Sequence, residues 1–113
     1  MSASFGPRAR TVLRVGGRAT PIARREARLA RLLKSYPDGL TRLDMLRMGE
    51  TALALGAPSY ASRLRKAGAL IESVPAASTD AAGGAIRFVR YRLSGDVHIA
   101  REPWPAISDG AKT

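Results

Sequence analysis

The segment SYASRLRKAGALIES, residues 59–73, combines two structural patterns on one short stretch of chain. Ala61, Leu64 and Ala67 recur at three-residue intervals, which predicts the buried side of an amphipathic helix. Gly68 is expected to end that helix, and the run after it has the composition of a strand. A helix followed directly by a strand is therefore the centre of the expected fold, and the flanking segments are interpreted around it.

The other side of this helix carries hydroxyl groups and positive charges. A solvated helix face has this composition, and so does a helix that lies against a polyanion. Arginine can bind O6 and N7 of guanine together, and Ser and Tyr hydroxyls suit phosphate contacts. The chain has no Asn or Gln, the usual bidentate readers of adenine, so base contacts would fall to Arg63 or Arg65. The candidate nucleic-acid-binding residues of this helix are Ser59, Tyr60, Ser62, Arg63, Arg65 and Lys66.

Two more helices are expected upstream. The first covers residues 20–36, with Thr at the cap, Pro in the first turn and a Pro-Asp-Gly breaker after it. Thr41 followed by Asp44 predicts a capping box at the start of a second helix, over residues 42–48 or further. Pro58 is expected to open the third helix, because proline fits the first turn.

Downstream of the third helix the sequence predicts a β-hairpin. Residues 69–75 and 86–93 have strand patterns, and the small residues 76–85 are expected to form the loop between them. Cations on an exposed edge strand also protect it from aggregation, so their presence alone does not identify a binding surface. The candidate nucleic-acid contacts of the hairpin are Arg87, Arg90 and Arg92.

The segments at the two ends are expected to lie outside the folded domain. Residues 1–20 predict a flexible basic arm with one short strand at Val12–Val15, residues 21–94 the domain, and residues 95–113 a tail, which Ile99, Trp104 and Ile107 could fasten to the core. The arm would enter a minor groove, act as a nonspecific electrostatic tether, or bind RNA, and each alternative needs the same charges. Its cations are Arg8, Arg10, Arg14 and Arg18.

Net charge is the strongest compositional signal in the chain. Its 113 residues contain 19 Lys and Arg against 9 Asp and Glu, a formal charge of +10, of which residues 1–36 hold +8. So strong a basic excess predicts an acidic partner, with nucleic acid favoured over an anionic membrane surface. No apolar run is long enough to cross a bilayer, and the lack of Cys fits a reducing cytoplasm, where we expect the protein to act.

The sequence argues against catalysis. It contains one histidine, His98, and no cysteine, so no Ser-His-acid or Cys-His set can be assembled. Asp38, Asp44 and Glu50 lack the spacing of a metal-binding loop, and the glycine pairs lack the strand, helix and lysine of a phosphate-binding loop. We expect neither an enzyme nor a bound metal or other cofactor.

Three segments carry a resemblance to a known family. GLTRLDML at residues 39–46, SRLRKAGALIES at 62–73 and RFVRYRL at 87–93 resemble the small winged helix-turn-helix domain proteins of bacteria and phages. The resemblance covers about residues 23–94 and departs at residues 50–57, which are longer than the family pattern. It implies a mainly α fold with a β-hairpin, classed as α+β, in which three helices form a winged helix-turn-helix.

The resemblance also implies a function. The third helix of such proteins enters the major groove of double-stranded DNA, and the wing lies on the flanking backbone. The chain is thus expected to be a DNA-binding transcriptional regulator of bacterial or phage origin, with the basic arm adding affinity. Two alternatives stay open: an adaptor that uses the same surface on an acidic protein partner, and a basic protein that binds RNA or the ribosome. A homodimer is also open, with the tail around Trp104 as its candidate interface.

Overall fold

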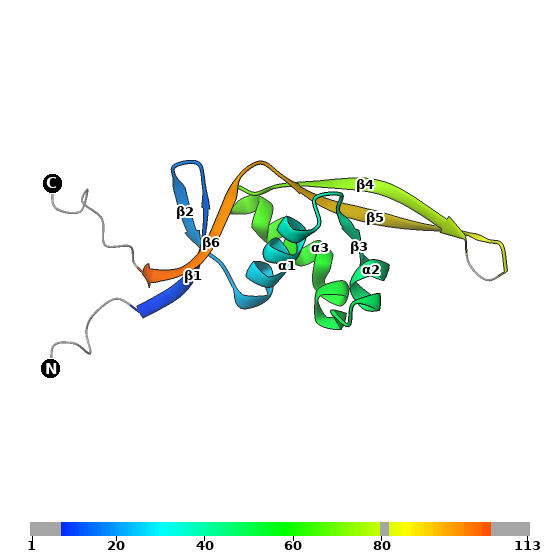
Figure 1. Cartoon of the computed structure of the whole chain (residues 1–113), viewed down its shortest axis with the longest axis horizontal. Helices are drawn as coiled ribbons and strands as arrows, with labels where there is room; N and C mark the ends of the chain where they lie inside the picture. Colours follow the sequence, from blue (N-terminus) through cyan, green and yellow to red (C-terminus); the bar gives the residue numbers. More distant parts are fainter. Residues whose placement is uncertain (1–7, 80–81, 105–113) are drawn as a thin grey trace, which may run out of the picture.

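The computed structural model describes residues 8–79 and 82–104, except for the side chains of residues 8, 78, 79 and 85–87. The molecule is elongated, with principal extents of 65 × 28 × 20 Å. One sheet lies at one end, the helices lie in the middle, and a long β-ribbon projects from the other end (Figure 1). The elements are β1 Arg8–Val15, β2 Arg18–Pro21, α1 Arg24–Ser35, β3 Leu40–Thr41, α2 Arg42–Arg47, α3 Thr51–Lys66, β4 Leu70–Thr79, β5 Ala85–Ser94 and β6 Val97–Trp104.

The expected fold class is wrong, because strands contribute as much to the architecture as helices. Within the described residues, six strands form two antiparallel three-stranded sheets, ordered β2-β1-β6 and β3-β5-β4. The protein is therefore an α+β molecule and not the mainly α, three-helix winged helix-turn-helix with a single hairpin. The difference arises in the segments near the two ends of the chain, where β1 pairs with β2 on one side and with β6 on the other.

The first sheet is built from segments expected to form the arm and the tail. Gly16 takes a φ of +58° in a two-residue turn, which lets β2 fold back on β1. On its other side β1 pairs with β6 along all eight residues, from Arg8 opposite Trp104 to Val15 opposite Val97. The strand expected in this region is therefore longer than predicted and has two partners.

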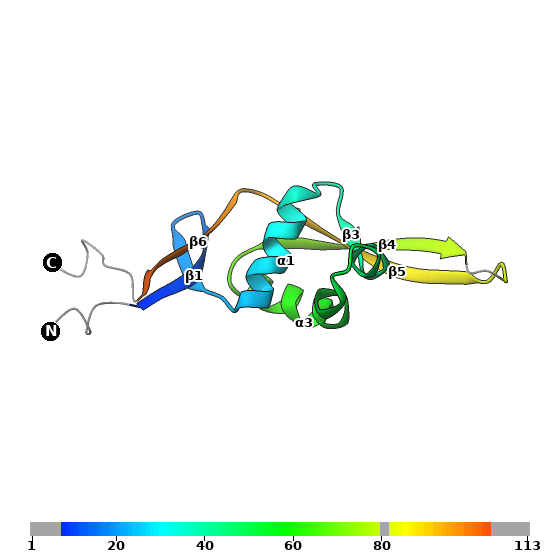
Figure 2. The same cartoon turned by 60° about the horizontal axis from the view of Figure 1, so that its bottom comes forward.

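The second sheet carries the long ribbon. β4 and β5 pair over ten residues each, from Leu70 opposite Ser94 to Thr79 opposite Ala85. The expected hairpin is confirmed, but its strands include five of the ten residues expected to form the loop, namely 76–79 and 85. Because β3 adds only two residues to the other edge of β5, the rest of the ribbon projects beyond the helices (Figure 2).

Helix α1 begins later than expected. Thr20 and Pro21, expected at its start, belong to β2, and the helix starts at Arg24. Pairing with β1 has taken these two residues, so the helix is shorter by about one turn. Its first turn is closed by Glu26, whose Oε1 accepts a hydrogen bond from the backbone N–H of Ala23 at 3.0 Å. Glu26 is buried, and its negative charge interacts favourably with the N-terminal end of the helix dipole.

The capping box expected at the start of α2 is confirmed. Thr41 Oγ1 accepts a hydrogen bond from the backbone N–H of Asp44 at 3.1 Å, and Asp44 Oδ2 accepts one from the backbone N–H of Thr41 at 2.9 Å. The helix is short and ends before Gly49, whose φ of +82° separates α2 from α3. The two helices are therefore distinct elements.

Pro58 lies inside α3 and does not open it, because the helix begins at Thr51. Proline has no N–H to donate to the carbonyl oxygen four residues earlier, which belongs to Ala54. Arg42 of α2 supplies the missing donor, since its Nε donates to Ala54 O at 2.6 Å. This side-chain donor explains how the helix continues through the proline with its carbonyl satisfied.

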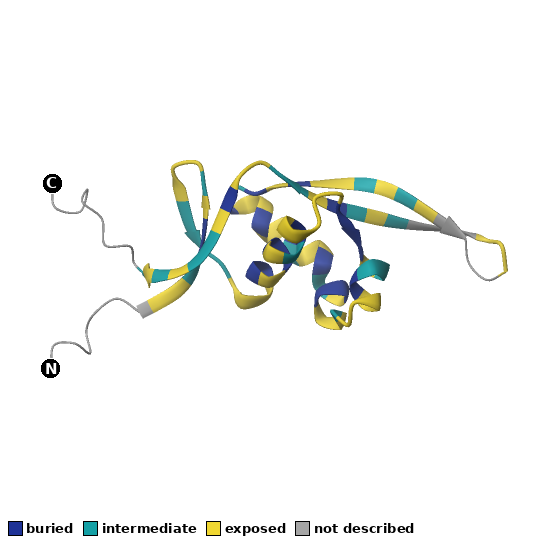
Figure 3. Ribbon diagram, in the orientation of Figure 1, coloured by how far each residue is buried: buried dark blue, intermediate teal, exposed yellow. Residues whose placement is uncertain are grey.

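One hydrophobic core joins both sheets to the helices. Most of it consists of Leu and Ala side chains from the facing sides of α1 and α3. Leu13 and Val97 join this core from the first sheet, and Ile71 and Tyr91 join it from the second. Buried residues gather at the helices and the strand segments beside them, whereas most of the projecting ribbon is not buried (Figure 3). Both sheets therefore pack on the same helices.

Candidate nucleic-acid interface

Helix α3 is oriented as the sequence predicted. Ala61 and Leu64 are fully buried, and Ala67 is only 5% exposed. Tyr60 was expected on the exposed side, but it is half-buried and reaches toward α1, because its hydroxyl accepts a hydrogen bond from Arg25. The opposite side is open to solvent, and we call it the α3 face; its members are Ser59, Ser62, Arg63 and Lys66. The burial pattern confirms which side of this helix is available to a partner.

Two contacts place the N-terminal part of α1 beside the α3 face. Arg63 Nη1 lies 3.5 Å from Glu26 Oε2, and Arg25 Nη1 donates to the Tyr60 hydroxyl at 3.4 Å. The Arg63 side chain is 63% exposed, so its guanidinium group stays accessible despite this ion pair. The cations of α1 and α3 therefore belong to one continuous surface.

Arg65 is turned away from the α3 face and toward β4. Its Nε donates to Ile71 O at 2.8 Å, and its Nη2 donates to Ser73 Oγ at 2.6 Å. These bonds tie the last turn of α3 to the strand that follows it. Of the two arginines expected to read guanine, Arg63 is therefore the better placed.

The cations of the ribbon have partners within the protein. Arg90 Nη1 lies 3.6 Å from Asp44 Oδ2 and donates to Gly39 O at 3.2 Å. Arg92 Nη2 lies 3.0 Å from Glu72 Oε1. These contacts neutralise the two side chains and hold β5 to α2 on one side and to β4 on the other. The side chain of the third candidate, Arg87, lies outside the described residues.

The arginines of the expected arm lie on the first sheet. Arg14 makes a bidentate ion pair with Glu102 of β6, at 2.7 and 2.6 Å, and the pKa of the Glu102 carboxyl is lowered by these hydrogen bonds. Arg18 Nη2 donates to Lys66 O at 3.1 Å, where a cation interacts favourably with the C-terminal end of α3. Arg10 is exposed on β1, and the side chain of Arg8 lies outside the described residues.

The structure brings together a set of arginines on α1 that were not among the residues expected to bind nucleic acid. Arg24, Arg28 and Arg31 follow the spacing i, i+4 and i+7 on the exposed side of the helix, and we call them the α1 stripe. Arg25 lies at its edge, toward α3. The signal was present in the sequence, because this spacing alone places the three side chains on one side of a helix.

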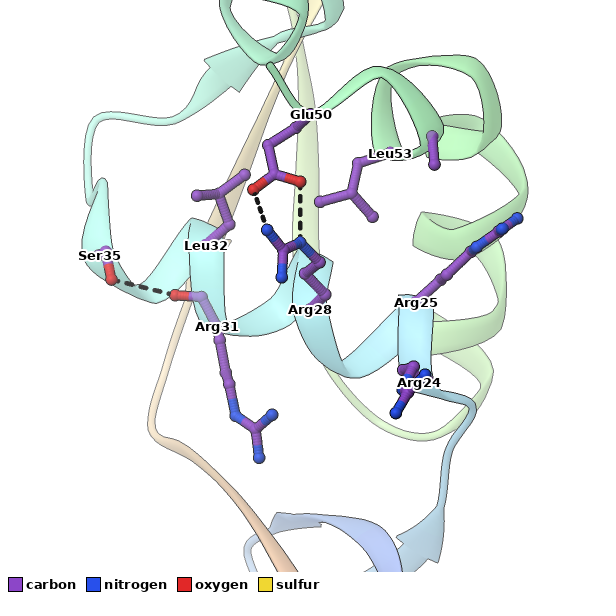
Figure 4. Close-up of a pocket in the computed structure, with 9 residues that line it drawn as sticks. Arg24, Arg25, Arg28, Arg31, Leu32, Ser35, Glu50 and Leu53 are labelled. Atoms are coloured by element: carbon purple, nitrogen blue, oxygen red, sulfur yellow. Dashed lines mark hydrogen bonds and ion pairs between the residues drawn. The ribbon is translucent and has the colours of Figure 1, made fainter. Parts of the chain in front are cut away.

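A groove separates the α1 stripe from the first turns of α3. It encloses about 710 Å³, and the four arginines, Leu32 and Leu53 are among its lining residues (Figure 4). We call it the arginine groove. Arg28 and Glu50 face each other across it, with Arg28 Nε and Nη2 donating to the carboxylate at 2.8 and 2.6 Å. These hydrogen bonds lower the pKa of Glu50, which is therefore ionised at neutral pH.

The remaining arginines of the groove lack acidic partners. The side chains of Arg24 and Arg31 make no ion pair with any described residue, and Arg25 bonds only the Tyr60 hydroxyl. Figure 4 shows Arg31 pointing away from the Arg28–Glu50 pair. Like charges three or four residues apart destabilise a helix by about 0.2–0.5 kcal/mol per pair. This arrangement therefore costs helix stability and concentrates positive charge at the rim of the groove.

Comparison of the chain with known protein families, curated proteins and solved structures found no match. The resemblance to bacterial and phage helix-turn-helix proteins stays a prediction.

Two properties of the described residues bear on other classes of function. No helix among them is long and apolar enough to span a bilayer. No group of three or more His, Cys, Asp or Glu residues in the same part of the chain is arranged to hold a metal ion. His98 is exposed on β6, opposite Arg14 in the strand register. The surface chemistry that stands out in the described residues is thus the basic surface of α1 and α3.

Proposed function

We propose that the protein binds double-stranded DNA with the α3 face and the α1 stripe beside it. The observation that carries the proposal is the charge balance of this surface. Its two carboxylates, Glu26 and Glu50, each contact an arginine. In contrast, the side chains of Arg24, Arg31 and Lys66 have no acidic partner among the described residues. A surface with unpaired cations and neutralised acids favours a polyanion as its partner.

The shape and chemistry of α3 suit the major groove of DNA. The helix has 16 residues and is about 24 Å long, and the major groove, about 12 Å wide, admits a helix of this kind. Arg63 would donate to guanine O6 and N7, and the hydroxyls of Ser59 and Ser62 would donate to phosphates. Leu55, 70% exposed and one turn before Ser59 on the same side, would contact a thymine methyl group.

The proposal includes a role in regulating transcription in a bacterium or phage. This role rests on the resemblance of residues 23–94 and goes beyond the surface chemistry. Binding to RNA and docking on an acidic protein are the competing functions, and both would use the same cations. The kind of partner, whether duplex DNA, RNA or an acidic protein, therefore has to be tested directly.

The test is fluorescence anisotropy of the full chain with GC-rich duplex DNA, AT-rich duplex DNA and single-stranded RNA, over about 50–200 mM salt. We expect duplex binding that weakens linearly in log affinity against log salt, and a preference for one duplex that persists at high salt. Arg63→Ala should remove about 1–3 kcal/mol of that preference, because it removes the base contact. Arg47→Ala is the matched control, since Arg47 is an exposed arginine of α2 without an ion pair among the described residues.

Other outcomes would redirect the proposal. Equal affinity for all duplexes, unchanged by Arg63→Ala, would show that α3 does not read bases. Stronger binding to RNA at every salt concentration would overturn the choice of DNA. No binding to any nucleic acid would favour the acidic protein partner.

A further inference from the structure

The arginine groove extends the proposed function and rests on it. We infer that this groove binds the phosphate backbone of the duplex whose major groove receives α3. The groove would thus form a second contact with the duplex, made by α1, and this contact would not depend on the base sequence. Four observations support the assignment: the charge left at the rim, the unfavourable position of the cations on α1, their spacing and the chemistry of the lining.

The charge left at the rim is positive. Glu50 is the one carboxylate among the lining residues, and Arg28 holds it with two hydrogen bonds. The Arg28–Glu50 pair is therefore close to neutral. Arg24, Arg25 and Arg31 remain around it, and each presents a guanidinium group without an acidic partner among the described residues.

The position of these arginines is unfavourable for α1 itself. Arg24 and Arg25 occupy the first turn, where the positive end of the helix dipole disfavours a cation. Arg28 lies within three or four residues of both of them and of Arg31, so the side chains also repel one another. A bound anion would relieve both effects.

The spacing suits a strand of phosphates. Arg24 and Arg31 are seven residues apart, which is about 10 Å along the helix axis. Phosphates recur along the whole of a DNA strand, so two cations this far apart can contact different phosphates of one strand. The guanidinium fork binds phosphate oxygens in pairs.

The chemistry of the lining favours a backbone over a free nucleotide. Its uncharged members include Leu32, Leu53, Ala52 and Ser35, and within the described part of the chain no aromatic side chain lines the groove to stack on a base. Glu50 is the one carboxylate in the lining that could accept hydrogen bonds from a base edge. Both of its oxygens already accept hydrogen bonds from Arg28. Phosphate oxygens are thus the ligand atoms that the groove suits.

The experiment compares two double variants in the anisotropy assay with the preferred duplex. Arg24→Ala/Arg31→Ala removes two cations from the groove, and Arg47→Ala/Arg101→Ala removes two exposed cations from α2 and β6. Each lost phosphate contact reduces the slope of log affinity against log salt by about 0.9. We expect the groove variant to lose about tenfold in affinity near 0.1 M salt and about 1.8 in slope, and the control to lose much less.

A conservative variant separates charge from local folding. Arg24→Lys/Arg31→Lys should retain most of the salt slope, and the melting temperature of the alanine variant should stay equal to or above that of the wild type. If the groove and control variants lose affinity and slope equally, the groove is not a backbone contact, although DNA binding by the α3 face stands. If the wild type binds no duplex, the proposed function fails and this inference fails with it.

Discussion

At the scale of single residues, Glu50 sets how much of the arginine groove is available to an anion. Its carboxylate lies against Arg28 and subtracts one charge from the surface that we assign to DNA. A carboxylate at this place strengthens the fold locally and weakens attraction to a polyanion. The two effects have opposite signs, so a single substitution can separate them.

Glu50→Gln should therefore tighten duplex binding while it slightly destabilises the fold. Loss of the carboxylate frees Arg28 for a phosphate, which should raise the slope of log affinity against log salt by up to about 0.9. Anisotropy over a salt series and urea denaturation measure the two effects. Glu72→Gln, which breaks the Arg92 pair on the ribbon, makes the same change in net charge and should affect binding less. Equal gains for both variants would mean that only net charge matters.

Gly39 gives a second prediction at the residue scale. Its φ is +91°, and a Cβ there would lie 2.7 Å from the carbonyl oxygen of Tyr91 on β5. Gly49 has a similar φ of +82°, but a Cβ there meets no atom within 4 Å. Gly39→Ala should thus lose about 2 kcal/mol or more of unfolding free energy, and Gly49→Ala about 1 kcal/mol from the left-handed backbone alone. Urea denaturation checks the difference, and equal losses would contradict the close approach of β5.

At the scale of elements, local signals predicted some features correctly and failed where strands competed with helices. The capping box of Thr41 and Asp44 was predictable because all of its partners lie within four residues. Thr20 and Pro21 carry an equally good local signal for a helix start, yet they pair with β1. Propensity is a weak prior, and the partner that a segment meets in the folded chain decides its structure.

Pro58 shows the same limit and provides a test. A proline in a helix normally marks its first turn, but Arg42 replaces the missing N–H by donating to Ala54 O. Arg42→Ala should cost about 1–3 kcal/mol, because it leaves a buried carbonyl without a donor. In the Pro58→Ala background the backbone N–H of residue 58 can supply the bond, so the same substitution should cost less. A double-mutant cycle by urea denaturation measures the coupling, and additive losses would contradict it.

At the scale of the whole molecule, the first sheet was the feature that the sequence did not reveal. β1 and β6 are separated by most of the chain, and the strand expected from the sequence was limited to Val12–Val15. A strand pattern does not identify a pairing partner that lies far away in the chain, so the two segments were interpreted as an arm and a tail. The arginine groove was missed for a different reason. Its spacing was visible, but the interpretation concentrated on the third helix.

The Arg14–Glu102 pair across β1 and β6 leads to a prediction about pH. The hydrogen bonds and charge of Arg14 lower the pKa of Glu102 in the folded protein. A carboxyl with a lowered folded pKa contributes stability that is present above its unfolded pKa and is lost as the pH falls through the folded pKa. Glu102→Gln should therefore destabilise the protein near pH 7, and the gap from the wild type should close as the pH falls through the lowered pKa of the folded protein.

The single tryptophan makes this gap measurable. Trp104 lies at the end of β6, opposite Arg8 of β1, so its fluorescence reports on the sheet that the ion pair joins. Urea denaturation followed at several pH values should give coincident curves for the two proteins at low pH and separated curves at neutral pH. Asp96→Asn is the control, because Asp96 is exposed and makes no ion pair with a described residue. A gap for Glu102→Gln that stays constant with pH would show that the carboxylate acts through packing and not through its charge.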